Sequence, residues 1–403
     1  MRTEPATTSS QLGAVRRSLA GFESFMSDSE WRRRARDPSI ADFVVGNPHD
    51  PPLPSYVDAL VAATTPRGTD WYAYKMNERS SVRTVAASLQ ERFGLPFEPR
   101  DVFMTNGNFG GLAVALRTIV DPGDEVVFIS PPWFFYEALI LASGARPVRV
   151  LADRRTFDLD VRAIERAITA RTRAIIVNSP HNPSGRIYPA DQLDELAAVL
   201  SAAEERHGGP IFLLSDEAYN RIVFDGRQYP TPVAHYARSL LLYTYAKTLL
   251  TPGSRLGYIA LPPTMPGREE LRDAIPIAQI LTGWAFPVAQ LQHALPELEP
   301  MSVDVGRLQA RRDRLCAALR EQGYELLVPE GTFYILVRSP LEDDLSFVDV
   351  LNAHDVFVLP GSVFEMPGWF RISVTASDDM VERGIEGFAR ARRDALAGEP
   401  HAG

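Results

Sequence analysis

From about residue 80 onwards, two patterns of apolar and polar positions alternate along the chain. Segments such as 82–94 and 190–208 repeat apolar residues at helical spacing, and each ends at a glycine. Short runs that are apolar throughout, such as 125–130, lie between these segments. Strands of this kind are expected where helices cover both faces of a sheet. The pattern therefore predicts an α/β fold with a mainly parallel sheet, whose last strand is 239–246.

The pattern changes after about residue 290, where a long helical segment precedes short strands and a closing helix. We expect a second, smaller α+β domain in this part of the chain. The N-terminal segment of the chain is polar, and we expect roughly its first 20 residues to be mobile. The predicted parts are an N-terminal arm (1–37), a loop joining the small domain (38–48), a large domain (49–290) and a small C-terminal domain (291–403).

Composition and charge are those of an ordinary globular protein, with 45% hydrophobic and 23% charged residues among 403. The net charge of -9 gives no general attraction to nucleic acid or to an anionic membrane. No stretch approaches ~18 consecutive apolar residues, and the N-terminus lacks the apolar core of an export signal. We therefore expect neither nucleic acid nor a membrane as a partner.

The cysteine and the histidines indicate the cellular compartment and whether a metal site is expected. The single cysteine, Cys316, lies in a helical pattern as an expected core residue, and it fits a reducing cytoplasm. The seven histidines are scattered, with no HxxxH pair and no cysteine at ligand spacing. We therefore expect a cytoplasmic protein without a metal site.

Polar side chains gather where the predicted strands end. They occur in "TNGN" (105–108), in "NSPHNPSG" (178–185), in "SDEAY" (215–219) and at Lys247. Ligands of open α/β sheets bind beyond the carboxyl ends of the strands. The sequence therefore predicts a ligand site at this edge of the sheet.

Lys247 stands in the apolar run "YTYAKTLL", and Arg255 follows it in a Pro-Gly turn. The lysine is either a strand-end residue that reaches solvent or a residue buried for chemistry. An apolar setting favours the neutral amine, which can form an imine with an aldehyde. Pyridoxal phosphate is such an aldehyde. It requires a carboxylate at its pyridine nitrogen, donors at its phenolic oxygen, an aromatic ring against its face and a phosphate cradle.

Candidate residues meet the requirements of the cofactor ring. Asp216, at a strand end, could pair with the pyridine nitrogen. Tyr219 and Asn182 could donate hydrogen bonds to the phenolic oxygen, and Trp133 in "SPPWFFYE" could stack on the ring. Each signal alone is weak, because a strand-end aspartate is usually a cap and aromatic runs are usually core. Their conjunction at one sheet edge is what indicates the cofactor.

The phosphate has its own candidates. The segment 105–111 joins a strand to a helix N-terminus, where free N–H groups and the helix dipole favour a phosphate. Thr244 and Arg255 could complete this cradle. By themselves, glycines after a strand more often form a plain turn, and an arginine after Pro-Gly is usually a surface charge.

The motifs "NSPHNPSGRIY", "SDEAY", "AKTLLTPGSRLGY" and "WFRIS" together resemble the class I/II aminotransferases, which are fold-type-I pyridoxal-phosphate enzymes. The resemblance covers essentially the whole chain. It implies a homodimer with shared active sites, and a large-domain sheet flanked by helices beside a smaller α+β domain. It also implies that Lys247 is the Schiff-base lysine, that Asp216 is the pyridinium partner, and that Asn182 and Tyr219 hold the phenolic oxygen.

The same resemblance implies further binding residues. Arg371 in "WFRIS" matches the arginine that grips the substrate α-carboxylate, a task suited to a planar guanidinium. Gly46 in "VVGNPHD" matches the glycine of the substrate loop, and Asn182 also faces the substrate. The remaining matches are the stacking residue Trp133, the phosphate loop of Gly107, Asn108 and Phe109, and its further ligands Thr244 and Arg255.

One loop, "DWYAYKMNERSSVR", departs from the family pattern because it lacks the usual glycine. The tyrosine that reaches the partner's phosphate is either Tyr72 or Tyr74. We expect Lys75, Asn77 and Glu78 to line the neighbouring subunit's site and to discriminate among substrate side chains.

The resemblance implies transamination of an L-amino acid to a 2-keto acid through the Lys247 imine. The unusual loop and the "LTPGSR" turn leave an alternative on the same fold, namely a lyase that eliminates or cyclises at Cγ, or an amino-acid oxidase. A catalytically inactive binding protein is disfavoured because no cofactor residue is missing.

Overall fold

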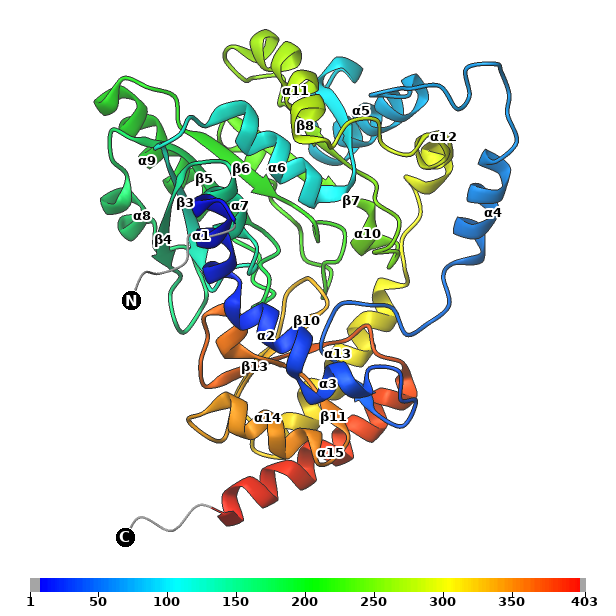
Figure 1. Cartoon of the computed structure of the whole chain (residues 1–403), viewed down its shortest axis with the longest axis vertical. Helices are drawn as coiled ribbons and strands as arrows, with labels where there is room; N and C mark the ends of the chain where they lie inside the picture. The colour runs from blue at the N-terminus through cyan, green and yellow to red at the C-terminus, as the bar shows by residue number, and fades with distance from the viewer. Residues whose placement is uncertain (1–7, 399–403) are drawn as a thin grey trace.

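The structure is a computed structural model that describes residues 8–398 (Figure 1). Within these residues, a seven-stranded sheet with the order β2-β8-β7-β6-β5-β3-β4 forms the centre of the larger part of the molecule. Its strands are β2 (Val102–Thr105), β3 (Glu125–Ser130), β4 (Arg146–Leu151), β5 (Thr172–Asn178), β6 (Phe212–Asp216), β7 (Ser239–Thr244) and β8 (Gly257–Ala260).

The sheet is mainly parallel, as predicted from the continuous apolar strands. Strands β4, β3, β5, β6 and β7 run parallel, whereas β8 runs antiparallel to both β2 and β7. The register pairs Asn178 with Asp216, and Asp216 with Leu242, so that the last residues of β5, β6 and β7 meet at one edge. Strand β8 was not predicted, because four residues after a turn are too few to show a period.

Helices cover both faces of this sheet. Val126 and Phe128 of β3 pack in the core formed with α6, α7 and α11, whereas Val127 and Ile129 pack in the core formed with α8 and α9. The helices are α4 (Pro54–Ala63), α5 (Arg79–Phe93), α6 (Gly107–Ile119), α7 (Tyr136–Ala142), α8 (Val161–Ala167), α9 (Ala190–His207), α11 (Arg268–Thr282) and α12 (Ala289–Leu298). Alternate residues thus face opposite layers, yet both faces need apolar side chains. Among residues 8–398, no helix has the length and apolar character needed to cross a membrane.

The smaller part contains an antiparallel sheet with the order β12-β13-β10-β9, together with a short parallel pair of β1 and β11. Its core includes Phe347, Phe370, Phe388 and Cys316, so the cysteine is a core residue as expected. Burial raises the pKa of the Cys316 thiol to about 12. The elements are β1 (Ala41–Asp42), β9 (Leu326–Leu327), β10 (Tyr334–Arg338), β11 (Val356–Phe357), β12 (Leu359–Pro360), β13 (Trp369–Ser373), α13 (Val305–Glu321), α14 (Asp344–Asn352) and α15 (Asp378–Gly398).

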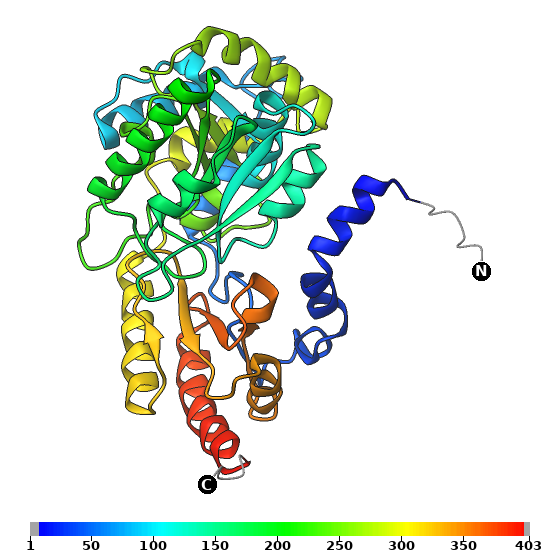
Figure 2. The same cartoon turned by 90° about the vertical axis from the view of Figure 1, so that its left-hand side faces the viewer.

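The N-terminal segment differs from the mobile arm that we expected. It forms α1 (Ser10–Ser18), α2 (Ala20–Asp28) and α3 (Glu30–Arg34), and it runs along the outside of both parts (Figure 2). The Gln11 amide donates to the carbonyls of Leu141 and Ala142 at the end of α7, and Trp31 is buried in a cluster with small-domain residues. These contacts hold the helices to the molecule. The first seven residues of the predicted arm lie outside the described residues.

The packing of helix α12 concerns the boundary between the two domains. Helix α12 falls in the range predicted for the small domain, yet Leu291 and Leu295 of α12 share a core with Val85 and Leu89 of α5. This contact favours a limit after α12 rather than at residue 290. The domain limits otherwise stay predictions.

Candidate active site

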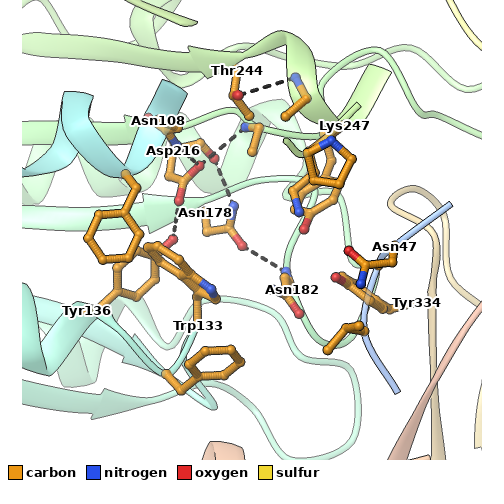
Figure 3. A pocket seen from close by; sticks show the side chains of 18 of the residues that line it. Asn47, Asn108, Trp133, Tyr136, Asn178, Asn182, Asp216, Thr244, Lys247 and Tyr334 are labelled. Atoms are coloured by element: carbon orange, nitrogen blue, oxygen red, sulfur yellow. Dashed lines mark hydrogen bonds between the residues drawn. The ribbon is translucent and has the colours of Figure 1, made fainter. Parts of the chain in front are cut away.

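A cavity of about 230 Å³ lies at the carboxyl edge of the parallel strands, where residues of the large and small parts face each other (Figure 3). Strands β5, β6 and β7 end at this edge, so the polar residues that follow them reach one space. The predicted site residues that line the cavity are Gly46, Asn108, Phe109, Trp133, Asn182, Asp216, Tyr219, Thr244, Lys247, Arg255 and Arg371.

Asp216, the last residue of β6, is a buried carboxylate that is only 4% exposed. The Asn108 side-chain amide donates to its Oδ1 at 2.7 Å, and the Tyr136 hydroxyl donates to its Oδ2 at 2.5 Å. No cationic side chain among residues 8–398 forms an ion pair with it. Burial therefore raises the pKa of Asp216 to about 6, although these donors and the charge of Lys247 oppose the rise. A protonated ring nitrogen would supply the missing cation.

Lys247 lies on the short helix α10 (Tyr245–Thr248), directly after β7, and its amine is 5.6 Å from the ring centres of both Tyr219 and Phe333. Its place at the cavity argues against a lysine that merely reaches solvent. The chain has only one other lysine, Lys75. The Lys75 ammonium is held by Glu78 at 2.8 Å, so Lys247 is the lysine that can react at this site.

The N-terminus of α6 and Arg255 form a positive end of the cavity. Gly107 begins α6 with a φ of +73°, and a Cβ at this position would lie 2.7 Å from Nη2 of Arg255. Glycine thus allows the guanidinium to approach the helix N-terminus. Arg255 pairs with no carboxylate in the described part of the chain, and burial lowers its pKa. A phosphate fits this unneutralised end, because helix N–H groups and a guanidinium both favour an anion.

Thr244 caps α10 from the adjoining strand end. Its hydroxyl accepts from the Ala246 N–H at 3.3 Å and donates to the Leu256 carbonyl at 3.2 Å. The threonine therefore lines the predicted phosphate end, with its hydroxyl held by the backbone on both sides.

Arg371, in the middle of β13, is a buried arginine that is only 3% exposed. It donates to Oδ1 of Asn182 at 2.9 Å and to the Val44 carbonyl at 3.2 Å, and its guanidinium lies 3.8 Å from the ring centre of Tyr334. Its Nε is buried without a hydrogen-bond partner. Within residues 8–398 no carboxylate pairs with it, so a substrate carboxylate can complete this site.

Gly46 allows the substrate loop to lie against the small domain. A Cβ at this position would lie 2.4 Å from the Phe333 ring and 2.8 Å from the Tyr334 hydroxyl. No larger residue fits there without displacing an aromatic ring that borders the cavity.

Two buried tyrosines face each other beside Lys247. Burial raises the pKa of Tyr219 well above its ordinary value. Burial would also raise the pKa of Tyr334, but the charges of Arg371 and Lys247 outweigh it and lower that pKa. The Tyr334 hydroxyl is therefore the more acidic of the two.

Sequence reasoning missed several residues that line the cavity. Tyr136 stands in the "SPPWFFYE" motif used for Trp133, and Tyr334 stands in a segment interpreted only as a strand. Asn178 begins "NSPHNPSG", and its amide connects the Asp216 carbonyl with the Asn182 N–H. The quoted motifs contained Tyr136 and Asn178, but the contacts that select such residues join distant parts of the chain, as between Tyr136 and Asp216, which are 80 residues apart.

Tyr72 and Tyr74 do not line the cavity of their own chain. The Tyr72 hydroxyl donates to the Thr64 carbonyl at 2.5 Å, whereas Tyr74 is 88% exposed and packs against Phe286 with 5.1 Å between ring centres. Which of the two tyrosines reaches a second subunit stays a prediction.

The polar residues of this loop have local partners, and the role in substrate selection that we expected stays a prediction. The Asn77 side chain accepts from the Met104 N–H at 2.8 Å and thereby holds the loop to β2. Glu78 caps α5 through the Arg79 N–H and pairs with Lys75. These contacts account for the polarity of the loop within the chain itself.

The structure therefore defines a cofactor-dependent enzyme. A reactive lysine, a buried carboxylate without a cation and an anion cradle at a helix N-terminus fit pyridoxal phosphate. A buried arginine without an anion fits an amino-acid substrate at the same cavity.

Known proteins identify the family. The family model described as aminotransferase class I and II matches residues 41–388, and this chain belongs to that family. It is 29% identical over 370 residues to an aspartate/prephenate aminotransferase of Thermus thermophilus, covering 90% of this chain and 92% of the relative. It is also 32% identical over 260 residues to a probable N-succinyldiaminopimelate aminotransferase of Mycobacterium tuberculosis, covering 63% of each.

Solved structures agree with this assignment. An aminotransferase from Eubacterium rectale has a TM-score of 0.87 and 28% identity, covering 97% of this chain and 99% of its own. The Thermus thermophilus aspartate aminotransferase with maleate has a TM-score of 0.78 and 25% identity, covering 97% of this chain and all of its own. The protein is a pyridoxal-phosphate-dependent aminotransferase that acts on amino acids.

Proposed function

We propose that Lys247, Asp216 and Arg371 divide the work of transamination at this cavity. The observation that carries the proposal is that each of these charged groups lacks an ionic partner among the described residues, although all three line one space. Buried charges without partners are costly, and a ligand with the complementary charges would remove that cost.

Pyridoxal phosphate, when bound, supplies an electron sink for the bond-breaking step. Asp216 would hold the proton on its ring nitrogen, and Tyr219 and Asn182 would donate to its phenolic oxygen. The phosphate and ring face would be held by the N–H groups of Gly107, Asn108 and Phe109, and by Thr244, Arg255 and Trp133.

Lys247 would hold the cofactor aldehyde and would afterwards act as general base at the substrate α-carbon. The rings of Tyr219 and Phe333 lie beside its amine, at 5.6 Å between the amine and each ring centre.

Arg371 would bind the α-carboxylate of both the amino acid and the keto acid. The hydrogen bond to Asn182 and the contact with Tyr334 hold the guanidinium fork in one orientation. A fork held in this way suits a planar carboxylate, and it places the α-carbon toward Lys247.

We also propose a homodimer, which an exposed apolar surface supports. Ile280 and Leu281 of α11 are 57% and 67% exposed, and Phe286 and Tyr74 extend this surface. It adjoins the cavity, because the Trp284 carbonyl accepts from the Asn106 side chain just before α6. Light scattering should give the mass of a dimer, and Leu281→Arg should shift it toward the monomer. A monomeric wild-type protein would exclude this assembly.

The cytoplasmic location predicted from the sequence remains a prediction.

The half-reaction tests the proposed chemistry. Holoenzyme mixed with a panel of amino acids should release one equivalent of keto acid per cofactor, with a change in cofactor absorbance and no ammonia. A second keto acid should restore the original spectrum. Release of ammonia with every active substrate would instead indicate the lyase or oxidase chemistry.

A further inference from the structure

The cations that line the cavity leave none for a second substrate carboxylate. Among residues 8–398, the lysines and arginines at the cavity are Lys247, Arg255 and Arg371, and no histidine lines it. The proposed function assigns them to the aldehyde, the phosphate and the α-carboxylate. A substrate side chain that carries a carboxylate would therefore meet no cation of this chain.

Aromatic side chains form one wall of the same cavity. Phe109, Trp133 and Phe134 line the cavity. The Phe109 and Trp133 rings pack edge to face with 5.4 Å between centres, and Phe135 lies behind all three at 4.9 to 5.2 Å. This wall offers an apolar surface and no ionic partner.

The N-terminal helix α2 completes this wall from outside. Phe22 stacks on Phe134 with 4.4 Å between ring centres and an interplanar angle of 19°, and it meets Phe135 at 5.2 Å. Phe134 is thus held between two rings. Phe134 and Val45, the residue before Gly46 in the substrate loop, pack against the same buried cluster and line the cavity.

We infer that the preferred amino donor carries a large uncharged apolar side chain, with aromatic side chains best, and that Phe22 is a positioning residue for this preference. The inference rests on the proposed function and specifies its substrate class. An aromatic side chain gains from burial against the wall and from ring–ring contacts. A side-chain carboxylate would lose its water without gaining a partner.

The two cations of the loop at 67–78 already have contacts within their own chain. In the loop that we propose faces the neighbouring site, Lys75 is held by Glu78 and Asp70, and Arg67 lies over the Trp71 ring at 5.7 Å. Either cation would have to give up these contacts before it could reach a second substrate carboxylate.

Two unreactive acids test the inference on the holoenzyme. 3-Phenylpropionate carries one carboxylate and a phenyl ring, and maleate carries two carboxylates. Titration followed by cofactor absorbance or calorimetry should give a Kd for 3-phenylpropionate that is at least about tenfold lower. Maleate binding that equals or exceeds that of 3-phenylpropionate would overturn the inference.

Variants in α2 test the part played by Phe22, which does not line the cavity. Phe22→Ala should weaken 3-phenylpropionate binding by about three- to tenfold and leave maleate binding unchanged. Phe22→Leu should retain much of the wild-type affinity for 3-phenylpropionate. Phe25→Ala is the matched control, since Phe25 lies on the same helix but packs on Trp31. If Phe22→Ala and Phe25→Ala lost the same affinity for 3-phenylpropionate, Phe22 would not be a positioning residue. The same would follow if Phe22→Ala lost equal affinity for both acids.

Failure of the proposed function would look different from failure of this inference. If no amino acid changed the cofactor spectrum while 3-phenylpropionate still bound better than maleate, the assignment of transamination to these residues would fail and the inferred pocket would stand. If acidic amino acids reacted best, the chemistry would stand and the inferred preference would fail.

Discussion

Asp216 and Arg371 are two buried charges at one cavity, but they are held in different ways. Asp216 is held inside the large domain, by Asn108 and Tyr136. Arg371 belongs to the small domain, yet its partners are Asn182 of the large domain and the backbone of Val44 in the joining segment. The cofactor end of the site is thus built within one domain, whereas the substrate end is assembled from several parts of the chain.

This difference has a functional consequence. A site inside one domain can hold the cofactor regardless of how the domains move. A site assembled across the domains is complete only when they meet, so substrate binding and domain contact are coupled. Variants at the two ends should therefore separate changes in the work of the cofactor from changes in substrate binding.

The largest effect is expected where the two ends meet, at Lys247. Lys247→Ala should abolish turnover while the protein stays folded and binds the cofactor weakly, because no other lysine lies at the cavity. Borohydride reduction of the wild type followed by peptide mapping should label Lys247 alone. Lys75→Ala, the change at the chain's only other lysine, is the matched control and should keep the label. A label on Lys75 would show that the assignment is wrong.

Asp216→Asn should next reduce kcat by several orders of magnitude and affect KM much less, since a neutral amide cannot hold the ring proton. Steady-state kinetics with one donor and one acceptor measure both constants. A variant with nearly normal kcat would mean that another group stabilises the protonated ring.

Arg371→Ala should raise KM for every amino-acid substrate by a similar factor, roughly 30- to 1000-fold, because each loses the same ionic contact. Cofactor affinity should stay unchanged, in contrast to the variants at the cofactor end. Arg371→Lys should recover only part of the loss, since an ammonium lacks the planar fork. A loss of cofactor affinity equal to the loss of substrate affinity would refute the separation of the two ends.

The pH dependence of stability should reveal Asp216 in the cofactor-free protein. Its pKa rises from 3.8 to about 6 on folding because of burial, so the folded state holds this proton more tightly than the unfolded state does. The resulting stabilisation is complete below about pH 4 and is lost as the pH rises through 6. Relative to Asp216→Asn, the wild type should lose roughly 3 kcal/mol of unfolding free energy over this range. Urea unfolding at several pH values would measure it, and parallel curves for both proteins would contradict it.

The smallest effect on substrate choice is expected in the loop at 70–78. Lys75→Ala and Glu78→Gln should keep the wild-type ranking of amino donors, because both side chains interact within their own chain. Glu78→Gln retains an N-cap acceptor and should cost at most about 1 kcal/mol of stability. A changed ranking would restore the role in specificity that the sequence suggested.

Sequence reasoning succeeded where a residue's place follows from the topology of the sheet. Asn182, Asp216 and Lys247 follow the ends of adjacent parallel strands, so their meeting at one edge could be predicted from the strand pattern and the motifs. Local contacts of loop side chains could not be predicted in the same way. For Lys75, Asn77 and Glu78, the sequence does not show that Glu78 caps α5 or that Asn77 accepts from the backbone of β2.

The sequence by itself determined the α/β fold and the meeting of Lys247 with most of the other predicted site residues at one cavity, because each leaves a local pattern of period or motif. Only the tertiary structure decided that Tyr136 contacts Asp216, that Arg371 lacks an anion, that β8 enters the sheet antiparallel, and that Phe22 of α2 stacks on Phe134. These features depend on contacts between residues far apart in the chain. The free energies of these contacts depend on long-range packing and on the water that is lost from the packed groups. Neither can be predicted from a short segment of sequence.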